Sequence, residues 1–197
     1  MQLAGDDFLD RIAAPLGAFY LAAGAMNLVA GARAWRVGRR PGRAGAWLAL
    51  AAGFLGLGMA AWLGHPPEIP QPLKSAIDAA LGPVVFTLGS LATLVVLYVG
   101  RRFFVKPAVA WTLLNLSLVF LGASSSDPHF AAVVARPDNL PIVAMVYLLA
   151  FFTWLATAQA VENDDRLARG EGPVEKQYAE SVLVWPDLVY IELIAMV

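Results

Sequence analysis

Five long stretches of the chain contain no charged residue, and short charged segments separate them. These stretches are residues 12–32, 44–64, 79–100, 107–126 and 139–161. Each is about 20 residues long, which is the length of helix that crosses the hydrocarbon core of a bilayer. Backbone polar groups in lipid must bond within the chain, so crossing segments of this kind are helical. The pattern therefore predicts an all-α integral membrane protein with five transmembrane helices.

A sixth apolar segment, residues 188–197, follows a charged and glycine-containing segment. Ten residues are too few to cross a membrane. The segment starts like a helix and contains no residue that would stop one. We expect it to be the start of a sixth transmembrane helix, with the chain continuing beyond Val197.

The composition excludes several other classes of protein. Of the 197 residues, 59% are hydrophobic and only 15% are charged, against roughly 45–50% and about 25% in soluble domains. The 14 basic and 15 acidic residues leave no positive surplus to bind nucleic acid. Because the chain has no cysteine, it cannot form disulfides, thiolate zinc sites or iron–sulfur clusters.

The basic residues predict how the helices are oriented. Three of the 14 lie in alternate loops or at the N-terminus, namely Arg11, Lys74 and Arg136. The remaining eleven follow the first, third and fifth stretches: Arg33, Arg36, Arg39, Arg40, Arg43, Arg101, Arg102, Lys106, Arg166, Arg169 and Lys176. By the positive-inside rule, this distribution places the N-terminus outside and the segment after the fifth helix in the cytoplasm. A bacterial inner membrane is the expected location.

Several residues indicate how the helices pack. Small residues recur every fourth position in two stretches, which lets helix backbones approach closely in lipid. They are Ala14, Ala18 and Ala22 in the first stretch and Ala52, Gly56, Ala60 and Gly64 in the second. Pro83, beside Gly82, predicts a kink or a later helix start in the third stretch. Trp47 and Trp111 are expected near the membrane interface, where tryptophan is enriched.

The two histidines are the candidate cofactor ligands. His65 follows the second stretch and His129 follows the fourth, so both are predicted on the outer side, where they could share a site. A haem held between helices needs histidine within the spans, and no span contains one. We therefore interpret both as interfacial loop histidines and expect this chain to bind no haem or metal by itself.

Polar residues in or beside the spans are candidates for proton handling or for helix contacts. Asp78 stands at the mouth of the third helix and Glu192 lies in the sixth segment, and acidic groups there can mark proton pathways. For Asp78, an ion pair with Lys74 or a place near a helix N-terminus is the simpler explanation. Asn27 and Asn115 are predicted to form hydrogen bonds between helices.

A short segment near the C-terminus carries a family resemblance. Trp185, Pro186, Asp187, Leu188 and Tyr190 lie in the run Glu-Ser-Val-Leu-Val-Trp-Pro-Asp-Leu-Val-Tyr. This run resembles the amphipathic lead-in to the C-terminal half of cytochrome b, the subunit-four-like chain of quinol–cytochrome c reductase (bc-type) complexes. The similarity covers about residues 178–197, and residues 1–160 resemble no part of that family. The family's Pro-Glu-Trp-Tyr signature and its haem-bearing histidines are not in this sequence.

The resemblance implies a membrane subunit of a bacterial electron-transfer complex that acts as scaffold and contributes to a quinone pocket. It implies partner subunits that carry haem b, quinone and an iron–sulfur cluster: a cytochrome b, an iron–sulfur protein and a cytochrome c. The expected organisation is a five-helix module (1–161), a charged cytoplasmic linker (162–177) and a subunit-four-like segment (178–197). Two alternatives remain: a small transporter or channel with Asp78 and Asn115 on its path, and a membrane anchor of a dehydrogenase or hydrogenase.

Overall fold

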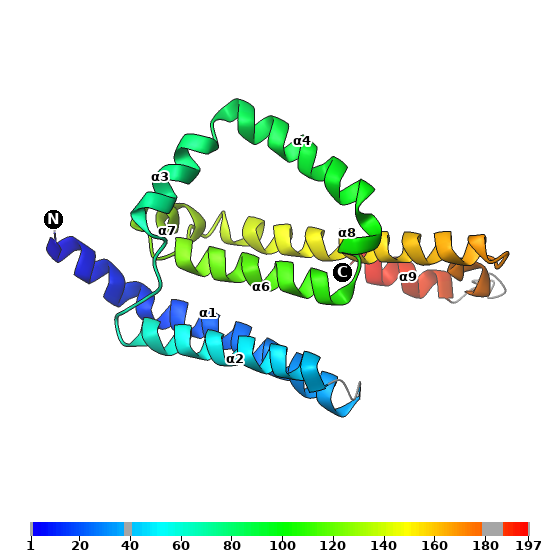
Figure 1. The fold of residues 1–197 in the computed structure, drawn as a ribbon, viewed down its shortest axis with the longest axis horizontal. Helices are drawn as coiled ribbons and strands as arrows, with labels where there is room; N and C mark the ends of the chain where they lie inside the picture. Colours follow the sequence, from blue (N-terminus) through cyan, green and yellow to red (C-terminus); the bar gives the residue numbers. More distant parts are fainter. Residues whose placement is uncertain (1, 38–40, 179–186, 197) are drawn as a thin grey trace.

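The computed structural model of the chain describes residues 2–37, 41–178 and 187–196, and all regular structure in these ranges is helical (Figure 1). This confirms the predicted all-α class. In chain order the elements are α1 (Gln2–Arg36), α2 (Pro41–Trp62), α3 (Gln71–Ala80), α4 (Pro83–Val99), α5 (Arg101–Phe104), α6 (Pro107–Ser124), α7 (Pro128–Val134), α8 (Leu140–Ala168), the 3-10 helix η1 (Val174–Tyr178) and α9 (Asp187–Met196).

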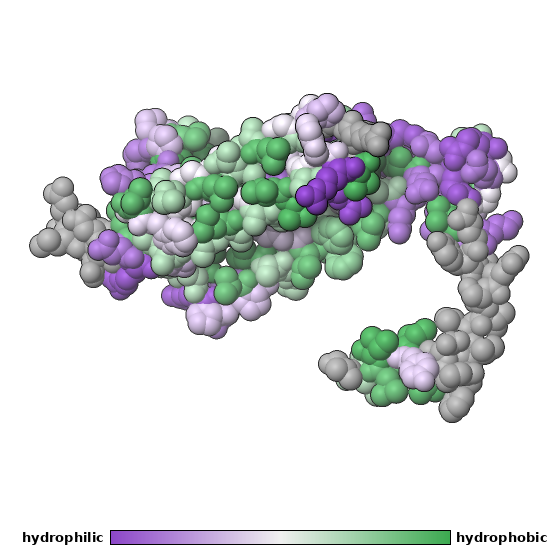
Figure 2. Space-filling view, turned by 90° about the horizontal axis from the view of Figure 1, so that it is seen from below, coloured by the Kyte–Doolittle hydropathy of each residue, from purple (hydrophilic) through white to green (hydrophobic). Residues whose placement is uncertain are grey.

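Four of these helices are long and apolar enough to cross a membrane. They are Phe8–Arg36 within α1, and the whole of α2, α6 and α8. The third predicted span is not one straight helix, because the chain bends by 85° between α3 and α4. With that bent pair counted as one span, the described residues contain five. Figure 2 shows apolar side chains over the middle of the molecule and hydrophilic ones toward both ends, as a membrane protein requires.

Helices α1 and α2 form a tight antiparallel hairpin through small residues that recur every seven positions. A methyl group at Gly17 would lie 2.7 Å from the Trp62 ring, and one at Gly58 would lie 3.2 Å from the Gly17 carbonyl oxygen. A seven-residue repeat keeps one stripe of a helix against its neighbour. The stripe consists of Gly17, Gly24 and Gly31 on α1 and Ala44, Ala51 and Gly58 on α2, all of them buried.

The four-residue repeats noted in the sequence do not form this contact. Ala14, Ala18 and Ala22 are exposed on α1, and on α2 Ala52 and Gly56 are exposed as well. Alanine and glycine are frequent enough in both helices to satisfy more than one spacing. The positions at intervals of seven leave little room for a side chain. A methyl group at Gly24 would lie 3.2 Å from the Leu55 side chain, and one at Gly31 would lie 3.1 Å from the Leu48 side chain.

The bend between α3 and α4 confirms the prediction made from Pro83. Leu81 and Gly82 interrupt the helix, and Pro83 takes the first position of α4, where its missing N–H costs no hydrogen bond. In Figure 1 the two helices form an arch that carries the chain from one end of the bundle to the other. Every residue of α4 is exposed.

Helix α8 extends well beyond the predicted fifth span. The charged segment from Glu162 to Ala168 was expected to start a linker, but it forms the last two turns of the helix. Its carboxylates meet the basic residues of α5, with Arg102 2.6 Å from Asp165 and Arg101 3.2 Å from Asp164. These ion pairs give the acidic turns a partner on a neighbouring element.

The end of α8 is set by Gly170, whose φ of 75° lies in the left-handed region. The N–H of Gly170 donates to the carbonyl of Leu167 at 3.0 Å, and the N–H of Glu171 donates to the carbonyl of Arg166 at 2.9 Å. This pair of bonds satisfies the last carbonyl groups of the helix, and glycine adopts the required backbone conformation at low cost. The linker between helices therefore begins after Ala168 rather than after Val161.

Candidate functional site

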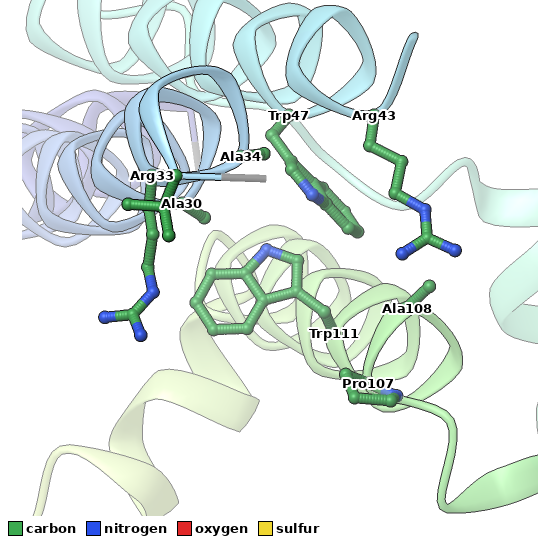
Figure 3. Close-up of a pocket in the computed structure, with 9 residues that line it drawn as sticks. Ala30, Arg33, Ala34, Arg43, Trp47, Pro107, Ala108 and Trp111 are labelled. Carbon is green, nitrogen blue, oxygen red and sulfur yellow. The ribbon is translucent and has the colours of Figure 1, made fainter. Parts of the chain in front are cut away.

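An open pocket lies at the end of the bundle that carries the basic loops. It has a volume of about 600 Å³, and helices α1, α2 and α6 contribute its walls. We call it the basic tryptophan pocket. It is lined by Ala30, Arg33, Ala34, Val37, Arg43, Trp47, Pro107, Ala108 and Trp111 (Figure 3).

Two tryptophans form the centre of this pocket. Trp47 from α2 and Trp111 from α6 meet edge to face, with ring centroids 6.1 Å apart and ring planes at 74°. Edge-to-face geometry of this kind is favourable for aromatic rings. The pair joins α6 to the α1–α2 hairpin at this end of the molecule (Figure 3).

A hydrogen-bonded cluster holds Trp111 in place from the adjoining interior. The indole Nε1–H of Trp111 donates to Oδ1 of Asn27 at 3.0 Å, and Nδ2 of Asn27 donates to Oδ1 of Asn115. Nδ2 of Asn115 donates in turn to the Trp111 carbonyl at 2.8 Å. Both asparagines are buried, so these bonds replace water that the amides would otherwise bind. The prediction that Asn27 and Asn115 bond between helices is confirmed.

Two arginines flank the tryptophan pair. Arg33 extends from α1 and Arg43 from α2, and both side chains reach toward the level of α6, on opposite sides of the rings (Figure 3). Both are exposed, and neither forms an ion pair within the part of the chain that the structure describes. The pocket thus combines an apolar, aromatic floor with two guanidinium groups that are available to an anion.

The opposite end of the bundle contains both histidines. His65 is exposed, and its Nδ1 lies 2.9 Å from the Leu63 carbonyl oxygen. His129 is also exposed, and its backbone N–H donates to Asp127. Among the described residues, no group of three or more metal-ligating side chains comes together.

Other residues connect the loop after α2 and helix α3 to the residues just before α7. Ser126 donates to the Pro67 carbonyl at 2.8 Å, and the Lys74 ammonium lies 2.7 Å from Asp127. The predicted pairing of Lys74 with Asp78 is therefore replaced by a contact with Asp127. Asp78 is the eighth of ten residues in α3 and is exposed, so it is not a carboxylate at the helix N-terminus.

The contact between Lys74 and Asp127 predicts a pH dependence. The hydrogen bond from Lys74, followed by those from the amides of Phe130 and His129, holds the pKa of Asp127 below its ordinary value. A carboxyl whose folded pKa is lowered stabilises the folded state above its unfolded pKa of about 4. That contribution disappears as the pH falls through the lowered folded pKa.

We therefore expect the amides of His129 and Phe130 to exchange with solvent faster, relative to their intrinsic rates, at pH 3 than at pH 6. Hydrogen exchange with mass spectrometric readout measures this. Asp127→Asn should remove most of the difference between the two pH values. Equal protection of these amides at both pH values in the wild type would show that the ion pair does not hold the loops together.

The remaining predicted site residues do not meet. Glu192 is exposed on α9, which stands apart from the rest of the molecule in Figure 2. Of the family-like segment, Trp185 and Pro186 lie outside the described residues, whereas Asp187, Leu188 and Tyr190 form the start of α9. Asn115 is buried against Asn27, so it lines no path that the exposed Asp78 shares.

The sequence did not identify the basic tryptophan pocket as a site. Arg33 and Arg43 entered only as signals of orientation, and Trp47 and Trp111 only as interfacial aromatics. One signal was available: Trp111 and Asn115 are four residues apart, on one face of a helix, and Asn27 and Ala30 share a face of α1. The pairing of those faces comes from the tertiary structure.

Searches of family models, of curated proteins and of solved structures find no match to this chain.

Proposed function

We propose that this chain is a non-catalytic membrane subunit of a bacterial electron-transfer complex related to quinol–cytochrome c reductases. In this proposal it acts as a scaffold beside a haem-carrying cytochrome b and contributes to the wall of a quinone pocket. The family-like segment at Trp185 to Tyr190 supports the choice of complex. Haem b, quinone and the iron–sulfur cluster are carried by partner subunits, among them an iron–sulfur protein and a cytochrome c.

The observation that carries the subunit role is the exposure of α4 and α8. Every residue of α4 is exposed, and no residue is buried in the most apolar 18-residue window of α8. Helix α4 also carries Thr87, Ser90 and Thr93, whose hydroxyls bond to carbonyls of their own helix. Small and hydroxyl side chains are typical of contacts between transmembrane helices, which fits a surface covered by a partner subunit.

The proposal includes five spans with the N-terminus outside, in the inner membrane of a bacterium. The end of α1, the start of α2, α5 and the end of α8 lie at the same end of the bundle in Figure 1. These segments carry Arg33, Arg36, Arg43, Arg101, Arg102 and Arg166. Helix α2 ends at one end of the bundle and α6 begins at the other, so the bent α3–α4 pair has to traverse the length between them. The positive-inside rule then places the basic end in the cytoplasm.

Co-purification tests this function. The affinity-tagged chain, expressed at native level and extracted in a mild detergent, should elute with subunits that show the reduced-minus-oxidised spectrum of a b-type haem. Trp185→Ala should reduce the haem recovered per tagged chain, whereas the matched change Trp35→Ala, at an exposed indole in α1, should not. A tagged chain that elutes alone and without haem would contradict the proposal.

A further inference from the structure

We propose that the basic tryptophan pocket binds the phosphate group of an anionic membrane phospholipid. In this site Arg33 and Arg43 bind the headgroup, and Trp47 and Trp111 contact the glycerol backbone and the first methylene groups. The proposal concerns the lipid around the chain and does not depend on any electron-transfer partner.

The charge of the site comes from Arg33 and Arg43. Their side chains flank the tryptophan pair on opposite sides, so the pocket presents positive charge at two points (Figure 3). Neither guanidinium has a carboxylate partner among the described residues, whereas Arg101 and Arg102, at the same end of the bundle, are paired with Asp164 and Asp165. A planar guanidinium donates two parallel hydrogen bonds to phosphate oxygens, which makes arginine well suited to this ligand.

The floor of the pocket distinguishes a lipid from a small soluble anion. Apart from the two arginines, the lining consists of alanine, valine, proline and tryptophan side chains. The indole N–H of Trp111 is already bonded to Asn27 and cannot serve a ligand. A free phosphate ion held at either arginine would gain nothing from these apolar walls. A phospholipid instead places its phosphate at the arginines and its apolar part against the rings.

The location of the pocket fits the same ligand. It lies where α1 ends and α6 begins, at one end of two helices long enough to cross a membrane. In the proposed orientation this end is the cytoplasmic interface, where tryptophan rings and lipid headgroups meet. Basic pockets between transmembrane helices on the cytoplasmic side bind anionic headgroups. Because the Asn27–Asn115 contact fixes Trp111, the aromatic floor is formed before the lipid arrives.

Native mass spectrometry of the delipidated, full-length chain tests the proposal. Phosphatidylglycerol and phosphatidylcholine are titrated separately, and inorganic phosphate is titrated as a third arm. We expect phosphatidylglycerol to bind more tightly than phosphatidylcholine, with about fivefold weaker binding in Arg33→Gln or Arg43→Gln and about 30-fold weaker binding in the double variant. The charge-matched double variant Arg136→Gln/Lys176→Gln should bind like the wild type. Millimolar inorganic phosphate should not displace the lipid.

Four results would overturn the proposal. Equal affinity for the two lipids would show that the headgroup charge is not recognised. Unchanged phosphatidylglycerol binding in the Arg33→Gln/Arg43→Gln variant, or an equal loss in the control variant, would place the lipid elsewhere. Displacement of the lipid by inorganic phosphate would identify a soluble anion as the ligand. Both arginines are exposed, and the circular dichroism spectrum of each variant checks that it remains folded.

Discussion

Replacing Gly122 by alanine is expected to destabilise the protein by about 1–3 kcal/mol. Gly122 lies on α6 against the ring of Tyr20 from α1, and a methyl group there would lie 2.5 Å from both Cζ and the hydroxyl oxygen. The ring cannot move aside easily, because Tyr20 is fully buried between Phe19 and Phe54. The added methyl group must therefore push α6 away from the hairpin. Unfolding in mixed micelles at increasing fractions of denaturing detergent measures the loss.

The matched control for this change is Gly89→Ala on α4. Nothing lies within 4 Å of a methyl group at that position, so the substitution should be neutral or stabilising by up to about 1 kcal/mol through helix propensity. Tyr20→Phe should recover part of the loss in the Gly122→Ala background, because the hydroxyl has no hydrogen-bond partner in the described structure. Equal stability of the Gly122→Ala and Gly89→Ala variants would contradict the close contact of α1 and α6.

The second large effect is expected for the asparagine pair. Asn27→Leu removes the acceptor of the part-buried Trp111 indole and the donor to the buried Asn115 Oδ1, so both groups lose these hydrogen bonds. The free energy of unfolding should therefore fall by about 1–2 kcal/mol, within the range measured for hydrogen bonds between transmembrane helices. Asn115→Leu should have a similar effect. The fluorescence of Trp111 should also shift to longer wavelength, because its ring loses a fixed position.

A double-mutant cycle separates this contact from general damage. The variant Asn27→Leu/Asn115→Leu should lose less stability than the sum of the two single variants, with a coupling of at least about 0.5 kcal/mol. Thr112→Val, on α6 with Asn115, is the control and should change stability little. The hydroxyl of Thr112 is exposed and bonds only to the Ala108 carbonyl. Strictly additive losses would mean that the two amides do not interact.

The sequence predicted the features that depend on local patterns. Uncharged stretches identified four helices that are long and apolar enough to cross a membrane, because long apolar segments have few alternatives to a helix of this kind. Pro83 predicted the break before α4, since proline cannot continue a preceding helix. Asn27 and Asn115 were expected to bond across helices, because an amide in an apolar helix needs a partner.

Features that depend on which helix faces align were not predicted. Several small-residue spacings are present on α1, and only the packing selects the face of Gly17 rather than that of Ala18. The partner of Lys74 lies 53 residues away at Asp127, beyond any local rule. The basic tryptophan pocket needs three helices to meet, so no single stretch of sequence contains it.

Cysteine accessibility in intact cells tests most directly the central claim that the chain crosses the membrane five times with its basic end in the cytoplasm. The protein has no cysteine, so each single substitution reports one position. With a membrane-impermeant maleimide, Glu68→Cys and Asp138→Cys should be labelled from outside. Lys106→Cys and Lys176→Cys should be labelled only after the cells are permeabilised. Labelling of Lys106→Cys from the same side as Glu68→Cys would show that the α3–α4 pair does not cross, and would contradict the account.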